Sequence, residues 1–117
     1  MKRSRRTFLQ RSKAESYIGF CIRAGKLTCG FNAVAAQHKD VFLILLCNTA
    51  SENAKKQALT LRNKFGCKIL LVCGKTLEEV TGKPNCKLAA VRDENLAKAI
   101  ASATDDCFIN YPGGNIR

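Results

Sequence analysis

Residues 41–47 read VFLILLC, seven apolar residues in a row with no polar alternation. A uniformly apolar run of this length is typical of a strand that is buried on both faces of a sheet. We therefore predict that Val41–Cys47 is the central strand of a layered α/β domain. A membrane-spanning helix needs roughly eighteen or more apolar residues. Since this run is the longest in the chain and no secretion leader opens the sequence, we expect a soluble protein.

Helix signals lie on both sides of this strand. Ser12 with Glu15, and Thr76 with Glu79, form S/T-x-x-E capping boxes, and Gly66 and Gly82 offer left-handed helix stops. Apolar residues recur at helical spacing behind each cap. We predict helices from Ser12 until Gly25, from Gly30 to about Lys39, from caps at 48–51 to Gly66, from Thr76 to Gly82 and from Asp93 to Ala103. The strands are predicted at 27–29, 41–47, 69–73 and 87–91.

Alternating helices and buried strands predict a three-layer α/β/α sandwich. The chain has 117 residues, which suits one domain and excludes two ordinary ones. We divide it into a basic N-terminal arm at 1–12, a folded domain at 13–104 and an irregular C-terminal tail at 105–117.

Positive charge is the first indication of function. Twenty Lys and Arg against nine Asp and Glu give a net charge of +11. Such an excess favours a polyanionic partner, although a solubilising tail on an ordinary basic surface is the alternative. Six bases come before the first acid: Lys2, Arg3, Arg5, Arg6, Arg11 and Lys13.

The cysteines give no metal or disulfide pattern. The chain has seven, an odd number with no CxxC pair, and His38 is its single histidine. Zinc-like spacing is therefore absent, and several cysteines lie in apolar runs where they behave as small hydrophobes. We expect a reducing compartment, the cytoplasm, with no metal and no cofactor.

Enzyme signatures are also absent: the sequence has no GxGxxG, GxxxxGK[ST], HExxH or GxSxG motif. The best catalytic candidate is Cys73, at the end of a predicted strand, with Lys75 nearby to lower its pKa. A structural cysteine packed beneath the next helix is the competing explanation. His38 is a candidate general base, but next to Lys39 and Asp40 it is more typical of a surface or capping residue. We expect a protein that is not an enzyme.

The segment 23–32, RAGKLTCGFN, places Lys26, Gly30 and Asn32 around a predicted helix start. Free N–H groups at a helix start favour phosphate, and glycine admits a close backbone. The Asn carboxamide can pair with a base edge. The alternative is that Gly30 and Asn32 are simple helix caps.

This segment, together with ASENAKK at 50–56, resembles the kink-turn-binding ribosomal protein family of L-seven-Ae and L-thirty-e, nearest to its bacterial YlxQ-type branch. The resemblance covers roughly residues 13–103. It implies an α/β/α sandwich around a mixed four-stranded sheet. It also implies binding to a sharply bent RNA internal loop with tandem sheared G·A pairs.

In that family a Gly-x-Asn-Glu signature reads the guanines, and a loop before the last strand meets an extruded nucleotide. The resemblance assigns Gly30 and Asn32 to the signature and Lys26 to the basic residue before it. The second loop corresponds to Gly82–Cys86, with Lys83, Pro84 and Asn85. The chain departs from the family at Ala33, where the signature has Glu, and at Ala36, where Lys is expected.

Three functions therefore remain open from the sequence. The first is a monomeric ribonucleoprotein component or assembly factor that stabilises a bent ribosomal or regulatory RNA. The second is an electrostatic RNA-binding or polyanion-binding module with no kink preference, and the third a small thiol enzyme using Cys73. Phe31 can either stack on a base or pack beneath its helix.

Overall fold

The computed structural model describes residues 13–37, 39–73, 76–84 and 86–103, and the backbone of 108–110. The arm at 1–12, His38, Lys75 and Asn85 lie outside the described residues. The elements are α1 (Lys13–Arg23), β1 (Leu27–Cys29), α2 (Phe31–Ala35), β2 (Leu43–Cys47), α3 (Glu52–Phe65), β3 (Lys68–Val72), α4 (Leu77–Thr81), β4 (Leu88–Val91), α5 (Glu94–Ser102) and β5 (Phe108–Asn110).

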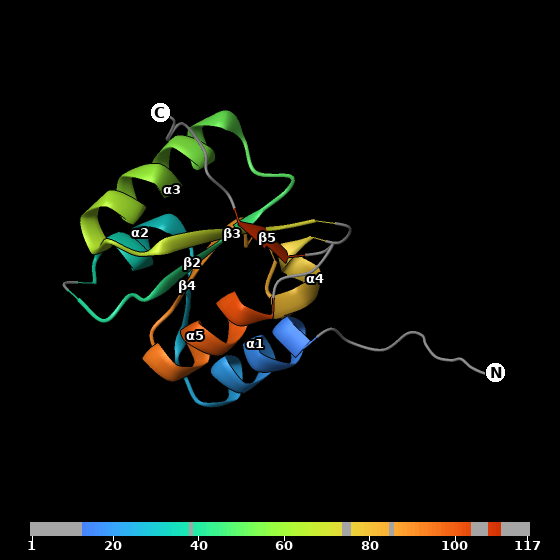
Figure 1. Ribbon diagram of the computed structural model, residues 1–117. Helices are drawn as coiled ribbons and strands as arrows, with labels where there is room; N and C mark the ends of the chain where they lie inside the picture. The colour runs from blue at the N-terminus through green and yellow to red at the C-terminus, as the bar shows by residue number, and fades with distance from the viewer. Residues whose placement is uncertain (1–12, 38, 74–75, 85, 104–107, 111–117) are drawn as a thin grey trace.

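The strands form one mixed sheet in the order β1-β4-β2-β3-β5 (Figure 1). β2 and β3 are parallel, and the other neighbouring pairs are antiparallel. β2 is the central strand, as its apolar run predicts, and all five of its residues are buried. The predicted α/β fold with a mixed sheet is therefore confirmed.

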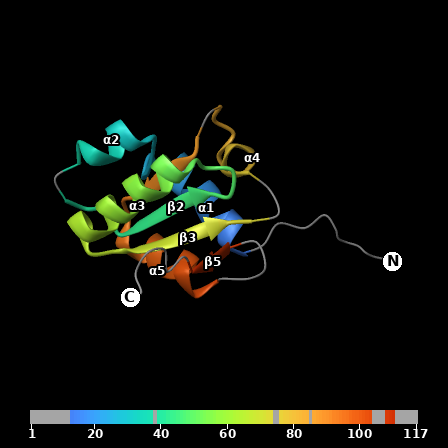
Figure 2. The same cartoon turned by 90° about the horizontal axis from the view of Figure 1, so that it is seen from above.

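Helices cover both faces of the sheet (Figures 1 and 2). α1, α4 and α5 lie on one face, and α2 and α3 lie on the other. Alternate residues of β2 serve the two cores: Leu43, Leu45 and Cys47 point toward α1, α4 and α5, whereas Ile44 and Leu46 point toward α2 and α3. Burial on both faces explains why the strand needs no polar position.

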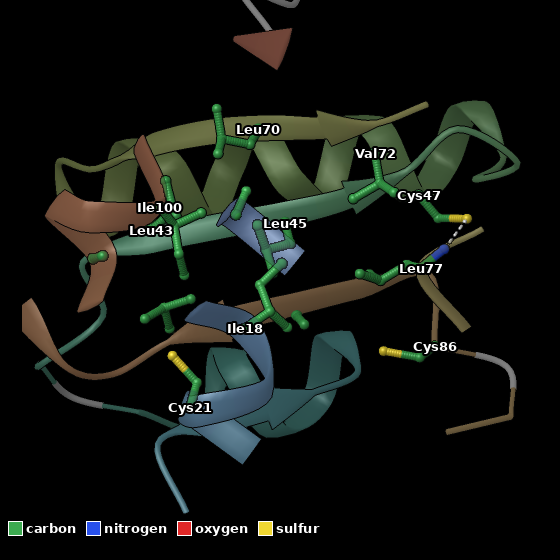
Figure 3. Close-up of a cluster of buried hydrophobic side chains, with 14 residues drawn as sticks. Ile18, Cys21, Leu43, Leu45, Cys47, Leu70, Val72, Leu77, Cys86 and Ile100 are labelled. Carbon is green, nitrogen blue, oxygen red and sulfur yellow. Dashed lines mark hydrogen bonds between the residues drawn. The ribbon is translucent and has the colours of Figure 1, made fainter. Parts of the chain in front are cut away.

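Figure 3 shows the core beneath α1, α4 and α5. Ile18 of α1 and Ile100 of α5 are fully buried there against the apolar residues of the sheet. At one end of this core the main-chain N–H of Leu77 donates to Cys47 Sγ at 3.3 Å. That bond ties the start of α4 to the end of the central strand.

The described helix caps agree with the sequence. Ser51 accepts from Ala54 N at the start of α3, and Asp93 accepts from Leu96 N at the start of α5. Thr76 and Glu79 form the predicted capping box of α4. Gly66 and Gly82 end their helices in the left-handed conformation.

α2 is shorter than predicted: it ends at Ala35 and does not continue to Lys39. Val34 is the one buried residue of this helix, and Ala36, Lys39 and Asp40 are exposed. Asp40 also has a positive φ of 69°, which a helix does not accept. The helix therefore ends where its apolar contacts end.

The segment predicted as an irregular tail contains a fifth strand. β5 pairs antiparallel with β3, with Leu71 opposite Ile109. The sheet therefore has five strands where the sequence predicts four. The fifth, β5, follows the predicted final strand at 87–91 and lies at the edge of the sheet. Within the described ranges, every helix is too short or too polar to cross a membrane.

Candidate functional site

Several segments that follow or precede strands meet at one end of the sheet. β4 runs antiparallel to β1 and β2, so its first residue, Leu88, lies beside their last residues. The segments 30–33, 48–51, 82–84 and 86–87 extend from these strand ends. We call these residues together the site edge.

Two main-chain hydrogen bonds hold these segments together. Gly30 N donates to Leu88 O at 2.7 Å, and Cys47 N donates to Lys87 O at 2.9 Å. Leu88 and Lys87 follow the 82–86 loop directly. The structure thus brings together two segments, 30–33 and 82–86, that the sequence places fifty residues apart.

Gly30 leaves an open position at the start of α2. Its φ of 93° and ψ of 144° lie in a region that suits glycine, and no side chain caps the helix. A Cβ built on Gly30 would meet nothing within 4 Å. Asn32 and Ala33 are exposed beside it. Another chain can therefore approach this backbone.

Phe31 does not share this exposure. Its side chain is half-buried and packs against the core beneath α2 and α3. The sequence leaves two roles open for Phe31, stacking on a base or packing beneath its helix, and the structure shows packing. The exposed amide of Asn32 is the polar group that this turn offers to a ligand.

The 82–86 loop is exposed at Lys83 and Pro84. It is anchored by the Thr81 hydroxyl, which donates to Leu77 O at 3.0 Å and accepts from Lys83 N at 3.2 Å. A buried threonine therefore fixes the main chain from which the Lys83 side chain extends.

Lys87 also belongs to the site edge and was not predicted. Its ammonium group donates to Thr49 Oγ1 at 2.8 Å and to Glu78 Oε1 at 3.0 Å. These contacts join the ends of β2, α4 and β4. The contact with Thr49 spans 38 residues, so no local pattern in the sequence indicates it.

Lys26 lies apart from the other predicted site residues. Lys26 directly precedes β1 and Gly30 directly follows β1, so the two residues lie at opposite ends of that strand. Lys26 N donates to Cys21 O and Lys26 O accepts from Arg92 N, at 2.8 and 2.7 Å. The structure does not bring its main chain to the site edge.

The thiols with unusual surroundings are Cys29 and Cys86, which the sequence did not single out. Cys29 ends β1 and is half-buried, and Cys86 is 2% exposed. A hydrogen bond from Cys86, supported by the charge of Lys83, outweighs burial and lowers the pKa of Cys29 to about 7. The same hydrogen bond, then burial, raises the pKa of Cys86.

Cys73 is half-buried at the end of β3, and its predicted neighbour Lys75 lies outside the described residues. Among the side chains that the structure describes, no three His, Cys, Asp or Glu residues are placed to hold a metal ion.

Comparisons with known proteins identify a fold and no function. The chain matches no protein family and no curated protein. It is similar to a solved structure of a protein with unknown function from Bacillus halodurans C, with 25% sequence identity and a TM-score of 0.70. The alignment covers 80% of this chain and 97% of the other.

We predict that Gly30→Ala lowers the free energy of unfolding by about 1–3 kcal/mol, because alanine must adopt a strained φ although its methyl group meets no atom. Denaturant unfolding measures the change. Gly66→Asn is the control, since asparagine tolerates the left-handed conformation of that helix end, and it should cost less. An alanine at 30 with wild-type stability would contradict the backbone assigned to this turn.

Proposed function

We propose that the protein is a non-catalytic RNA-binding protein that recognises a kink-turn or a related bent internal loop. The site edge is the proposed RNA surface, with segment 30–33 and the 82–86 loop as its two halves. The RNA is ribosomal or regulatory, and the protein acts as a monomer in the cytoplasm. All six cysteines of the described residues are free, which fits a reducing compartment.

One observation supports this proposal above the others: the hydrogen bond from Gly30 N to Leu88 O. It places the open glycine turn beside the loop that carries Lys83. A bent RNA presents two neighbouring features, the distorted pairs and a displaced nucleotide, and a surface built from two adjacent loops can contact both. The family resemblance of segments 23–32 and 50–56 assigns these same two loops to RNA.

Charge supports a nucleic-acid partner. The chain carries +11, and Lys83 and Lys56 are exposed on segments that begin at or near the site edge. The ion pair of Lys87 with Glu78 adds no net charge, since its members balance. Basic side chains around an open backbone attract phosphate, whereas the Asn32 amide supplies a donor and an acceptor for a base edge.

The two departures from the family bear on selectivity. Ala33 and Ala36 are both exposed, so the positions that would hold Glu and Lys carry methyl groups facing solvent. One base contact and one phosphate contact are therefore missing from the proposed surface. This favours a second candidate, an electrostatic module that binds RNA or another polyanion without preferring a kink.

The proposed mechanism is a population shift. An RNA internal loop exchanges between extended and kinked forms, and the protein stabilises the kinked form by binding it more tightly. The shift cannot exceed that difference in affinity. No bond is made or broken, so the mechanism needs no catalytic group.

The two candidates differ in their response to the RNA fold. We expect a kink-turn RNA to bind more tightly than the same duplex with its G·A pairs replaced by Watson–Crick pairs. Titration at equal length and equal salt measures both affinities. Equal affinities would reject kink recognition and support the electrostatic module.

Asn32→Ala should weaken RNA binding by about 1–3 kcal/mol, because a base-edge contact is lost. The side chain is exposed, so unfolding should change little. Asn95→Ala is the matched control: this exposed asparagine lies on α5, against the opposite face of the sheet. If both variants bind like the wild type, the site edge is not the RNA surface.

The basic arm should contribute affinity without selectivity. If the five bases of the arm and Lys13, the first residue of α1, contact phosphates, these six bases add roughly −4 to −5 to the slope of log K against log salt concentration. Replacing Lys2, Arg3, Arg5, Arg6, Arg11 and Lys13 with glutamine should weaken binding to every RNA alike and flatten that slope. An unchanged slope would show that the arm does not contact RNA.

A further inference from the structure

The outer face of α1 carries an exposed aromatic ring. Phe20 is 47% exposed, whereas Ile18 and Cys21 of the same helix are fully buried. Tyr17, one turn before Phe20, is half-buried, and its ring centroid lies 6.4 Å from that of Phe20. One turn after Phe20, the guanidinium carbon of Arg23 lies over the Phe20 ring, 4.8 Å from its centroid. Two rings and a guanidinium group therefore follow one another along the helix.

Positive charge gathers at the turn that follows this row, residues 23–26. Arg23 and Lys26 are both exposed there. Arg92 reaches the same turn from the end of β4: its main-chain N–H donates to Lys26 O at 2.7 Å, and its guanidinium group donates to Gly25 O, also at 2.7 Å. The next residue, Asp93, carries a carboxylate. Three cations against this one acid leave the turn positive.

This surface is separate from the site edge. α1 lies with α4 and α5 on one face of the sheet, whereas α2, which follows Gly30, lies on the other face (Figure 1). The turn at 23–26 directly precedes β1, and Gly30 directly follows β1, so the two lie at opposite ends of that strand. A ligand on α1 and a ligand on the site edge therefore use different groups of the protein.

We propose that this face of α1 binds two or three nucleotides of single-stranded RNA, with bases stacked on Phe20 and Arg23 and with phosphates at the positive turn. Aromatic rings beside cations bind single strands because every base has a π-face and every nucleotide a phosphate. Residues 17–23 span about 9 Å of helix, and stacked bases repeat about every 3.4 Å. A protein partner would need a contiguous apolar patch, whereas α1 offers a single exposed ring. The inference rests on the proposed RNA binding for its class of partner.

Tryptophan fluorescence tests the stacking directly. The chain has no tryptophan, so Phe20→Trp places a single fluorophore on this face. Phe42→Trp is the matched control, because Phe42 is the other exposed phenylalanine of the described residues and lies just before β2. On titration with an eight-nucleotide oligouridylate at low salt, the emission of Phe20→Trp should fall to a plateau, and that of Phe42→Trp should stay unchanged. Equal quenching of both variants, or none in Phe20→Trp, would overturn the proposal.

Affinities separate stacking from charge. Phe20→Leu keeps an apolar side chain but removes the π-face, so it should weaken oligouridylate binding about fivefold or more. Phe42→Leu should bind as the wild type does. Inorganic polyphosphate has the phosphates without the bases, and it should bind the wild type and both variants alike. If Phe20→Leu loses polyphosphate binding to the same extent, the ring does not act by stacking and the proposal is wrong.

A kink-turn RNA with fully paired ends distinguishes this surface from the site edge. Asn32→Ala should weaken its binding, and Phe20→Leu should not. Adding a single-stranded extension to that RNA should raise the affinity of the wild type but not that of Phe20→Leu. If the extension adds no affinity while Asn32→Ala still weakens binding, the α1 surface is rejected and the proposed function stands. If oligouridylate binding depends on Phe20 while Asn32→Ala binds as the wild type does, the α1 surface stands and the site edge is rejected.

Discussion

Burial of β2 on both of its faces is the constraint on which the other elements depend. Each of its five residues is buried, and the side chains at odd and even positions pack into different hydrophobic cores. Helices must therefore cover both sides of the sheet, and neighbouring strands must pair with both edges of β2. Because β3 is parallel to β2 and β4 is antiparallel to it, the end of β2 is surrounded by the end of β3 and the start of β4.

The site edge is a consequence of that arrangement. β1 pairs with β4, so the turn after Cys29 is carried to the loop before Leu88. The proposed RNA surface uses this junction: its exposed side offers Gly30, Asn32 and Lys83, and Cys86 lies on its core side. The pairing of β1 with β4 sets the geometry of that surface.

Local signals in the sequence were sufficient for most of the fold. The apolar run at 41–47 and the caps at Ser51, Thr76 and Asp93 act through neighbouring residues, so their outcome could be read directly from spacing. The length of α2 could not be predicted from spacing, because the helical pattern through 30–39 does not reveal that Val34 is the last buried residue of this helix. β5 was missed because a three-residue strand exists only through its pairing with β3. The Lys87 contacts join distant segments, so no local pattern predicts them. Lys26 is close to Gly30 in sequence but is separated from it by the extended length of β1.

The outer strands of the sheet have one further consequence. β1 and β5 each contain three residues, whereas the apolar strands β2 and β3 contain five and lie inside. An edge strand presents unpaired N–H and C=O groups that can recruit another chain, and a short edge offers few of them. The short strand β5 therefore covers the outer edge of β3, so that the most apolar part of the sheet does not become a template for aggregation.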